Sequence, residues 1–140
     1  MFANEFKLSI LGQPNIGKSL FVKRLVNSNN ILNDYIPTLG VDVNCLDITR
    51  DRKIRLHIWD CAGDSRFRGL KEGYHLDTNM AIIFKKTNDN SYINYLNELP
   101  SNIPILYIND YNIVDPSLSV NDYKNIIFNL VNNFYHDTMQ

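Results

Sequence analysis

The chain has 140 residues, of which 44% are hydrophobic, so it can form one core but not two. We therefore expect one domain over residues 1–140. The formal net charge of -1, from 14 Lys and Arg against 15 Asp and Glu, excludes a general electrostatic attraction to nucleic acid or to an anionic membrane. Two cysteines are too few for a disulfide framework, and the apolar runs are too short to cross a bilayer. We expect a reduced, soluble, intracellular protein that has no membrane anchor and does not bind nucleic acid.

Strand and helix patterns alternate in the first half of the chain. A short apolar run at 6–11 predicts a buried strand, and Gly12 separates it from a helix whose apolar residues fall within 20–26. Alternating apolar residues predict two further strands, at 41–49 and 53–60, and the polar turn between them joins these strands as an antiparallel hairpin.

The second half continues the alternation. Apolar runs at 80–84 and 103–108 predict strands buried on both faces, with a short amphipathic helix at 92–99 between them. A helix from about 122 to 131 and a last strand from Phe134 complete the pattern. Interleaved strands and helices predict an α/β fold, a mostly parallel sheet with one antiparallel edge hairpin and helices on both faces.

A phosphate-binding pattern lies between the first strand and the first helix. Residues 12–19 read Gly-Gln-Pro-Asn-Ile-Gly-Lys-Ser and match G-x-x-x-x-G-K-[ST]. The backbone N–H groups of such a loop point at an anion, Lys18 reaches the β- and γ-phosphates, and the Ser19 hydroxyl ligates Mg²⁺. Pro14 removes one N–H donor from this loop. The alternative is a plain glycine turn. The predicted nucleotide contacts are Gly12, Gln13, Pro14, Asn15, Ile16, Gly17, Lys18, Ser19 and Leu20.

Two more segments extend this predicted site. Asp60 and Gly63 belong to a Trp-Asp-Cys-Ala-Gly stretch at the end of a strand, where Asp60 can hold Mg²⁺ through water and the Gly63 N–H can meet a γ-phosphate. Tyr35 and Thr38 precede the hairpin, and Thr38 offers a second hydroxyl to the metal. Without the loop at Gly12, both segments would be interpreted as ordinary turns.

These residues resemble the Ras superfamily of small GTPases, with the Ran family the most similar. The similar stretches lie within about residues 6–110 and are Phe21-Val22-Lys23-Arg24, Pro37-Thr38-Leu39-Gly40-Val41, Trp59-Asp60-Cys61-Ala62-Gly63, Arg68-Gly69-Leu70-Lys71-Glu72-Gly73-Tyr74, Ala81-Ile82-Ile83 and Asn102-Ile103-Pro104-Ile105. The resemblance implies a P-loop NTPase fold and a GTP/GDP switch with Mg²⁺. Its mobile segments, 35–41 and 63–75, would contact protein partners. For the Ran family it also implies partners in nuclear transport, and hence a place in the cytoplasm, the nucleus or both.

One departure from this resemblance concerns hydrolysis. The family has a glutamine that orients the attacking water, and this chain has Asp64 at that position. The resemblance implies a catalytic set of Asp64, Thr38 and Lys18. An ionised carboxylate accepts hydrogen bonds but donates none, and it adds negative charge beside the phosphates. We therefore expect GTP turnover at or below about 10⁻⁴ s⁻¹, the rate of an unaided small GTPase.

Another departure concerns the base. The family reads guanine with Asn-Lys-x-Asp, whereas this chain has Asn109-Asp110-Tyr111-Asn112-Ile113. When the residues are counted without gaps from Pro104, Asp110 and Ile113 take the positions of the motif's Asn and Asp. With a one-residue deletion, Asn109 and Asn112 take these positions. Either way a charge-assisted pair is lost, a cost of about 1.5–3 kcal/mol, or roughly tenfold to a hundredfold in affinity. The Asn112 amide would also suit a base that has an oxygen where guanine has its exocyclic amine, such as xanthine.

A final departure is length. The chain stops where the family has its C-terminal helix, so we expect that helix to be missing and one face of the sheet to be uncovered, which favours association, for example as a homodimer. Two interpretations of function remain open. One is a Ran-like GTP-binding switch with impaired hydrolysis, and the other is a degenerate interaction module that occupies Ran-type partners without nucleotide turnover.

Overall fold

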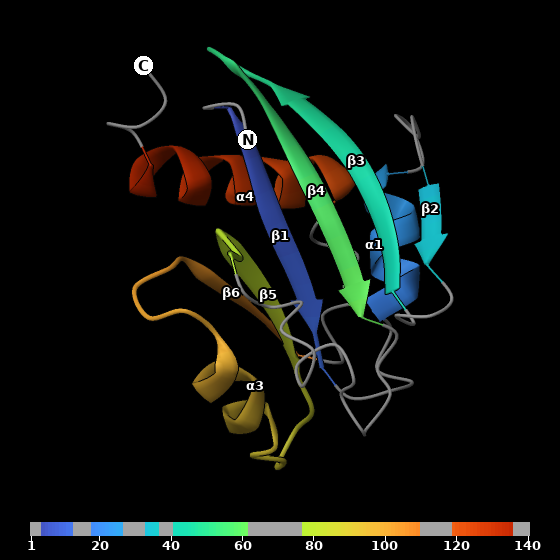
Figure 1. Cartoon of the computed structure of the whole chain (residues 1–140), viewed down its shortest axis with the longest axis vertical. Helices are drawn as coiled ribbons and strands as arrows, with labels where there is room; N and C mark the ends of the chain where they lie inside the picture. The colour runs from blue at the N-terminus through green and yellow to red at the C-terminus, as the bar shows by residue number, and fades with distance from the viewer. Residues whose placement is uncertain are drawn as a thin grey trace.

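The computed structural model of the chain describes residues 4–12, 18–26, 33–36, 41–61, 77–109 and 119–135. Apart from an added strand at 33–36 and the strand predicted from Phe134, the elements in these ranges follow the order that the hydrophobic periodicity predicts (Figure 1). In chain order they are β1 (Glu5–Leu11), α1 (Lys18–Val26), β2 (Asn33–Ile36), β3 (Val41–Thr49), β4 (Lys53–Cys61), β5 (Met80–Lys85), α3 (Tyr92–Glu98), β6 (Ile105–Asn109) and α4 (Val120–Phe134).

The strands form one sheet with the order β2-β3-β4-β1-β5-β6. The pairs β4–β1, β1–β5 and β5–β6 are parallel, while β3 pairs antiparallel with β4 along the predicted hairpin. The sequence analysis did not predict β2, which adds a second antiparallel pairing at the edge of the sheet. The predicted α/β class, with a mostly parallel sheet and an antiparallel edge, is confirmed.

Hydrophobic side chains cover both faces of this sheet. On one face, α1 and α4 pack over the strands, and both helices lie behind the sheet in Figure 1. On the other face, Tyr95 of α3 and Leu99 pack on Leu11, Ala81 and Ile83. The helices on both faces are therefore confirmed. We expected one face to lie uncovered because the family's final helix is missing, but in the described part of the chain α1 and α4 pack on one face and α3 packs on the other.

Helix α4 is longer at both ends than the sequence analysis predicts. The Ser119 side chain accepts a hydrogen bond from the Asp122 N–H, and the Asp122 carboxylate accepts one from the Ser119 N–H, so a capping box starts the helix. The strand predicted from Phe134 is wrong, because Phe134 is the last residue of α4. The helical period of the buried residues Tyr123, Ile127 and Val131 continues through this segment and outweighs its aromatic β-propensity.

Tyr135 fixes the end of α4 to the sheet. Its ring lies 5.3 Å from that of Phe6, and its hydroxyl donates a 2.6 Å hydrogen bond to the Asn79 carbonyl. Burial raises the pKa of the Tyr135 hydroxyl, and the hydrogen bond to Asn79 acts in the opposite direction. The hydroxyl therefore stays protonated and donating at neutral pH.

None of the helices in the described part of the chain is long and apolar enough to cross a membrane.

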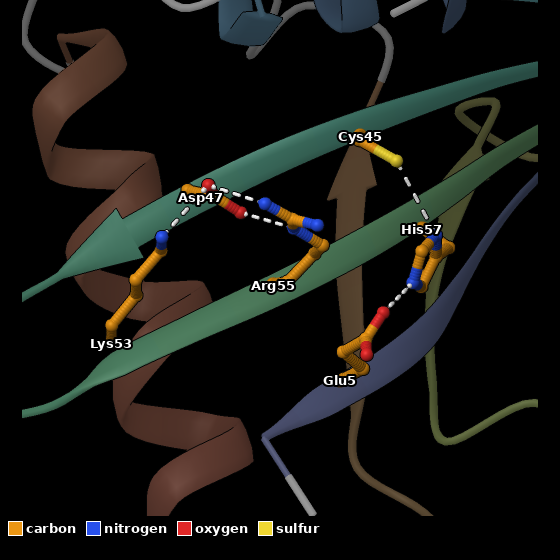
Figure 2. A network of polar contacts seen from close by, with 6 residues as sticks. All are labelled: Glu5, Cys45, Asp47, Lys53, Arg55 and His57. Carbon is orange, nitrogen blue, oxygen red and sulfur yellow. Dashed lines mark hydrogen bonds and ion pairs between the residues drawn. The ribbon is translucent and has the colours of Figure 1, made fainter. Parts of the chain in front are cut away.

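A polar network lies on the sheet face opposite α1 and α4 (Figure 2). Arg55 on β4 donates two hydrogen bonds to Asp47 on β3, at 2.8 and 3.1 Å, and Lys53 lies 3.4 Å from the same carboxylate. The Arg55 guanidinium holds the pKa of Asp47 below its usual range, and partial burial offsets some of this shift. The two strands are thus joined across this face by a bidentate ion pair as well as by their backbone ladder.

The Asp47 ion pair predicts a pH-dependent contribution to stability. A carboxyl group whose pKa is lower in the folded state stabilises the fold above its unfolded pKa, about 3.9, and the contribution disappears as pH falls through the folded pKa. Asp47→Asn should therefore lower Tm by a few degrees at pH 7, and the difference from wild type should shrink below about pH 4. Thermal unfolding of both proteins from pH 2 to 8 measures this, with the exposed Asp51→Asn as control. A constant difference at all pH values would contradict the assignment.

Candidate nucleotide site

Of the predicted site residues, Gly12, Lys18 and Asp60 lie at one edge of the sheet in the described part of the chain. Strands β4, β1, β5 and β6 are mutually parallel, so their carboxyl ends meet at the same edge. These strands end at Cys61, Leu11, Lys85 and Asn109, and Gly12 follows β1 directly. Ligands of open α/β sheets bind outside the carboxyl ends of the strands, and the helix after β1 begins there with Lys18.

Gly12 has a conformation and a packing that demand glycine. Its φ is +148°, which L side chains rarely adopt. A Cβ at this position would lie 2.9 Å from the Phe84 Cβ and 3.1 Å from the Phe84 carbonyl oxygen, both closer than ordinary contact. The backbone at Gly12 therefore passes directly against β5, and no larger residue fits between them.

Lys18 is held over the backbone of the same turn. Its side chain is buried, and its ammonium group donates a 2.5 Å hydrogen bond to the Gly12 carbonyl oxygen. This contact holds the first residue of α1 against the end of β1. An ammonium has three donors, so Lys18 can bind a phosphate oxygen while it keeps this carbonyl. Burial strengthens such a contact because the local dielectric is low.

Asp60 brings a buried carboxylate to the same edge. It is 3% exposed, one residue before the end of β4, and it pairs in register with Ile10 of β1 and with Asp42 of β3. A carboxylate in the interior must be compensated by hydrogen bonds or by a cation. Carboxylate oxygens are also ligands that Mg²⁺ prefers. The position fits the predicted role of Asp60 near a metal-bound phosphate.

The structure describes only part of the predicted base-binding segment and switch segments. Asn109 is the last residue of β6, in register with Lys85. Tyr35 lies in β2 opposite Asp42, and Leu20 projects from α1 with 47% of its surface exposed. Ser19 lies in the first turn of α1. The remaining predicted residues fall outside the described ranges, namely Gln13, Pro14, Asn15, Ile16, Gly17, Thr38, Gly63, Asp64, Asp110 and Asn112.

One residue of the site was missed by the sequence analysis. Phe84 forms the wall against which Gly12 packs, and its ring contacts the Phe21 ring of α1 at a centroid distance of 5.5 Å. The one sequence feature that could have indicated Phe84 is its place as an aromatic residue near the carboxyl end of a buried strand. Its contact with Gly12 depends on the pairing of β1 with β5, which periodicity alone does not specify.

The close packing at Gly12 yields a stability prediction. Gly12→Ala should lower the free energy of unfolding by about 1–3 kcal/mol, because the added Cβ meets Phe84 and the residue must keep a positive φ. Denaturant unfolding followed by circular dichroism measures the change. Asn94→Ala, at an exposed helical position in α3, is the control and should stay within about 0.5 kcal/mol of wild type. A Gly12→Ala protein as stable as wild type would contradict the described geometry.

A comparison with known families agrees with this geometry. Residues 7–111 match the family model described as Ras of Complex, Roc, domain of DAPkinase. The matched segment begins in β1, contains Gly12, Lys18 and Asp60, and ends two residues after β6. The Roc domain is a GTPase domain of the Ras superfamily, a type of domain that binds guanine nucleotides, usually with Mg²⁺. The chain therefore belongs to the Roc family of Ras-superfamily GTPase domains.

Proposed function

We propose that this Roc-family domain is a Mg²⁺-dependent switch that binds GTP and GDP at the edge formed by β1, α1 and β4. The observation that carries the proposal is the buried Lys18 ammonium, held on the Gly12 carbonyl in the first turn of α1. The ammonium has three N–H donors, and it lies at the positive end of α1. Both features favour binding of an anion such as a polyphosphate.

The donor chemistry of this edge fits both nucleotide and metal. In the proposed complex the backbone N–H groups of residues 12–20 and the Lys18 ammonium bind the phosphates. Ser19, Thr38 and, through water, Asp60 hold Mg²⁺, which neutralises charge on the phosphate oxygens. The packing of Gly12 against Phe84 fixes where the loop leaves β1, and Asp60 brings a buried carboxylate to the same edge of the sheet.

We propose that hydrolysis is slow. The residue that would face the attacking water is Asp64, and a carboxylate there accepts a proton from water but donates nothing to the developing negative charge. Lys18 still stabilises the charge on the phosphates. The domain would consequently hold the triphosphate state longer than a GTPase with glutamine at this position.

We also propose a loosened preference for guanine. The segment that would read the base is Asn109-Asp110-Tyr111-Asn112, which lacks the family's Asn-Lys-x-Asp. In the proposed site Asn109, Asp110 and Asn112 contact the base, without the aspartate that accepts from two guanine donors. An amide at Asn112 can donate to a base oxygen, so xanthine nucleotides belong among the candidate ligands.

Segments 35–41 and 63–75 are the proposed contacts for protein partners, because they flank the γ-phosphate position. The proposal also includes kinship with Ran, partners in nuclear transport and a place in the cytoplasm or nucleus, which rest on the sequence stretches alone. It includes homodimer formation, which rests on the expected absence of the family's C-terminal helix. A second candidate function is an interaction module without turnover. It is favoured by the two changes at Asp64 and at the base-reading segment.

Calorimetric titration with GDP, GTP, ATP and xanthosine triphosphate, with and without Mg²⁺, tests the proposal. Wild type should bind GTP more tightly than ATP, and Lys18→Ala should weaken GTP binding by about a hundredfold because a charged donor to the phosphates is lost. Lys23→Ala, an exposed position on the same helix, should bind as wild type does. Equal binding of GTP and ATP would remove guanine from the proposal, and equal binding by wild type and Lys18→Ala would refute the site.

Turnover tests the role of Asp64. Purified wild type should release phosphate from GTP at or below about 10⁻⁴ s⁻¹, and Asp64→Gln should be at least about tenfold faster because the amide can orient water and donate. Single-turnover phosphate release measures both proteins, with Asp51→Asn as a control for a carboxylate-to-amide change elsewhere. Rapid turnover by wild type, or no gain in Asp64→Gln, would show that Asp64 does not limit hydrolysis.

A further inference from the structure

A Cys–His–Glu chain crosses three strands on the sheet face opposite α1 and α4 (Figure 2). The Cys45 Sγ lies 3.4 Å from the His57 Nδ1, and the His57 Nε2 lies 2.7 Å from the Glu5 Oε1. Cys45 on β3 is paired directly with His57 on β4, and Glu5 comes from β1 on the other side of β4. Register and pleat therefore bring a thiol, an imidazole and a carboxylate into one line.

The glutamate contact determines which nitrogen of His57 carries the proton. The Glu5 carboxylate is an acceptor, so at 2.7 Å the Nε2 must carry hydrogen. In the neutral ring the Nδ1 is then an acceptor, and its lone pair points at the Cys45 thiol. The opposite tautomer would set a lone pair against the carboxylate oxygen and remove the acceptor from Cys45. Glu5 thus orients His57 as a base for Cys45.

Proton transfer within this chain produces the reactive form of the cysteine. When the S–H proton moves to His57 Nδ1, a thiolate lies beside an imidazolium whose other N–H is bonded to Glu5. Other charged groups on this face are Lys7, Asp47, Lys53 and Arg55. Arg55 is engaged by Asp47, and the Lys7 ammonium lies 4.3 Å from the Trp59 ring centroid. Arg55 also interacts electrostatically with Cys45 and Glu5, and the His57 ring is a hydrogen-bond partner of the thiol.

The surroundings decide which chemistry this thiol can do. All three side chains are partly exposed, with 28% of the His57 side chain and 20% of the Glu5 side chain accessible, so a small reagent can approach. The backbone N–H groups of β3 and β4 lie in the plane of the sheet and do not point at a group bound on its face. Acyl transfer needs such donors for its oxyanion, whereas disulfide exchange releases a thiolate and needs none. No metal-binding group of His, Cys, Asp or Glu occurs in the described ranges.

We propose that Cys45 is an activated thiol that forms a mixed disulfide with small disulfides of the glutathione type. His57 takes the thiol proton, and the Cys45 thiolate attacks one sulfur of the disulfide. A new bond forms between Cys45 and that sulfur as the original S–S bond breaks, and the second sulfur leaves as a thiolate that takes up the proton. The disulfide is the oxidant, and it yields one thiol and one mixed disulfide. Glu5 acts as a positioning residue.

This site is separate from the nucleotide edge. The pair Cys45–His57 is three ladder positions from the pair Asp42–Asp60, a separation of about 10 Å along the strands. The inference therefore does not depend on nucleotide binding. The mixed disulfide of Cys45 with glutathione would place a charged tripeptide on the β3–β4 face. It would therefore change which molecules can bind to this face.

The test is the rate at which glutathione disulfide modifies Cys45 in the intact chain at pH 7. Mass spectrometry of tryptic peptides separates Cys45 from Cys61, because Arg50, Arg52, Lys53 and Arg55 lie between them. Cys45 in wild type should react about tenfold faster than in His57→Asn, because an ordinary thiol is only a few per cent thiolate at this pH. The reaction rate of Cys45 should fall less in Glu5→Gln than in His57→Asn, because the glutamine amide oxygen can still accept a hydrogen bond from the His57 Nε2. Lys53→Gln, on the same face, should react as wild type does.

A second comparison needs no variant. Cys45 in folded wild type should react faster than Cys45 in the same chain unfolded in urea at the same pH, although folding partly covers it. Equal rates in wild type and His57→Asn would overturn the proposal. So would a folded wild type that reacts more slowly than its unfolded chain, and this comparison decides the matter if His57→Asn fails to fold.

Discussion

The parallel pairing of β1 with β4 on one side and β5 on the other is the constraint on which the candidate sites depend. It sets Ile10 beside Asp60 and Leu11 beside Ile83, so the turn after β1 begins where the buried carboxylate of β4 and the end of β5 meet. Gly12 then has to pass Phe84 without a side chain, and Lys18 returns over the Gly12 carbonyl. A shift of one residue in either pairing would turn each side chain to the opposite face and separate these groups.

The same sheet carries two kinds of chemistry at different places. The carboxyl-end edge carries the buried ammonium of Lys18 and the buried carboxylate of Asp60, which we propose to hold a polyphosphate and a divalent cation. The face opposite α1 and α4 offers side chains that meet across strands: the bidentate pair of Asp47 with Arg55 and the chain from Cys45 through His57 to Glu5. The first of these is the nucleotide site proposed above, and membership in the Roc family supports that proposal. The second follows from residues particular to this sheet face.

Much of this arrangement was predictable from local patterns. The 3.6-residue and two-residue periods indicated α1, the β3–β4 hairpin and the buried strand β5, and the glycine-lysine pattern located Gly12 and Lys18 because its chemistry lies within eight consecutive residues. Other features depend on long-range pairing. Strand β2 reads Asn-Asp-Tyr-Ile, with polar residues that are poor in strands, and its assignment rests on its pairing with β3. The contact of Glu5 with His57 joins residues 52 positions apart, and no local signal announces it. The end of α4 was misjudged because aromatic residues near Phe134 suggest a strand while the helical burial period continues.

Chemical-shift mapping on the ¹⁵N-labelled protein tests the central claim most directly. Titration with Mg²⁺ and a non-hydrolysable GTP analogue should move the amide resonances of Gly12, of the loop that follows it, of the first turn of α1 and of Asp60, while Thr49, at the far end of the β3–β4 hairpin, stays unchanged. Shifts confined to other surfaces, or no shifts at millimolar nucleotide, would contradict the account, because the turn between β1 and α1 would then not bind a polyphosphate.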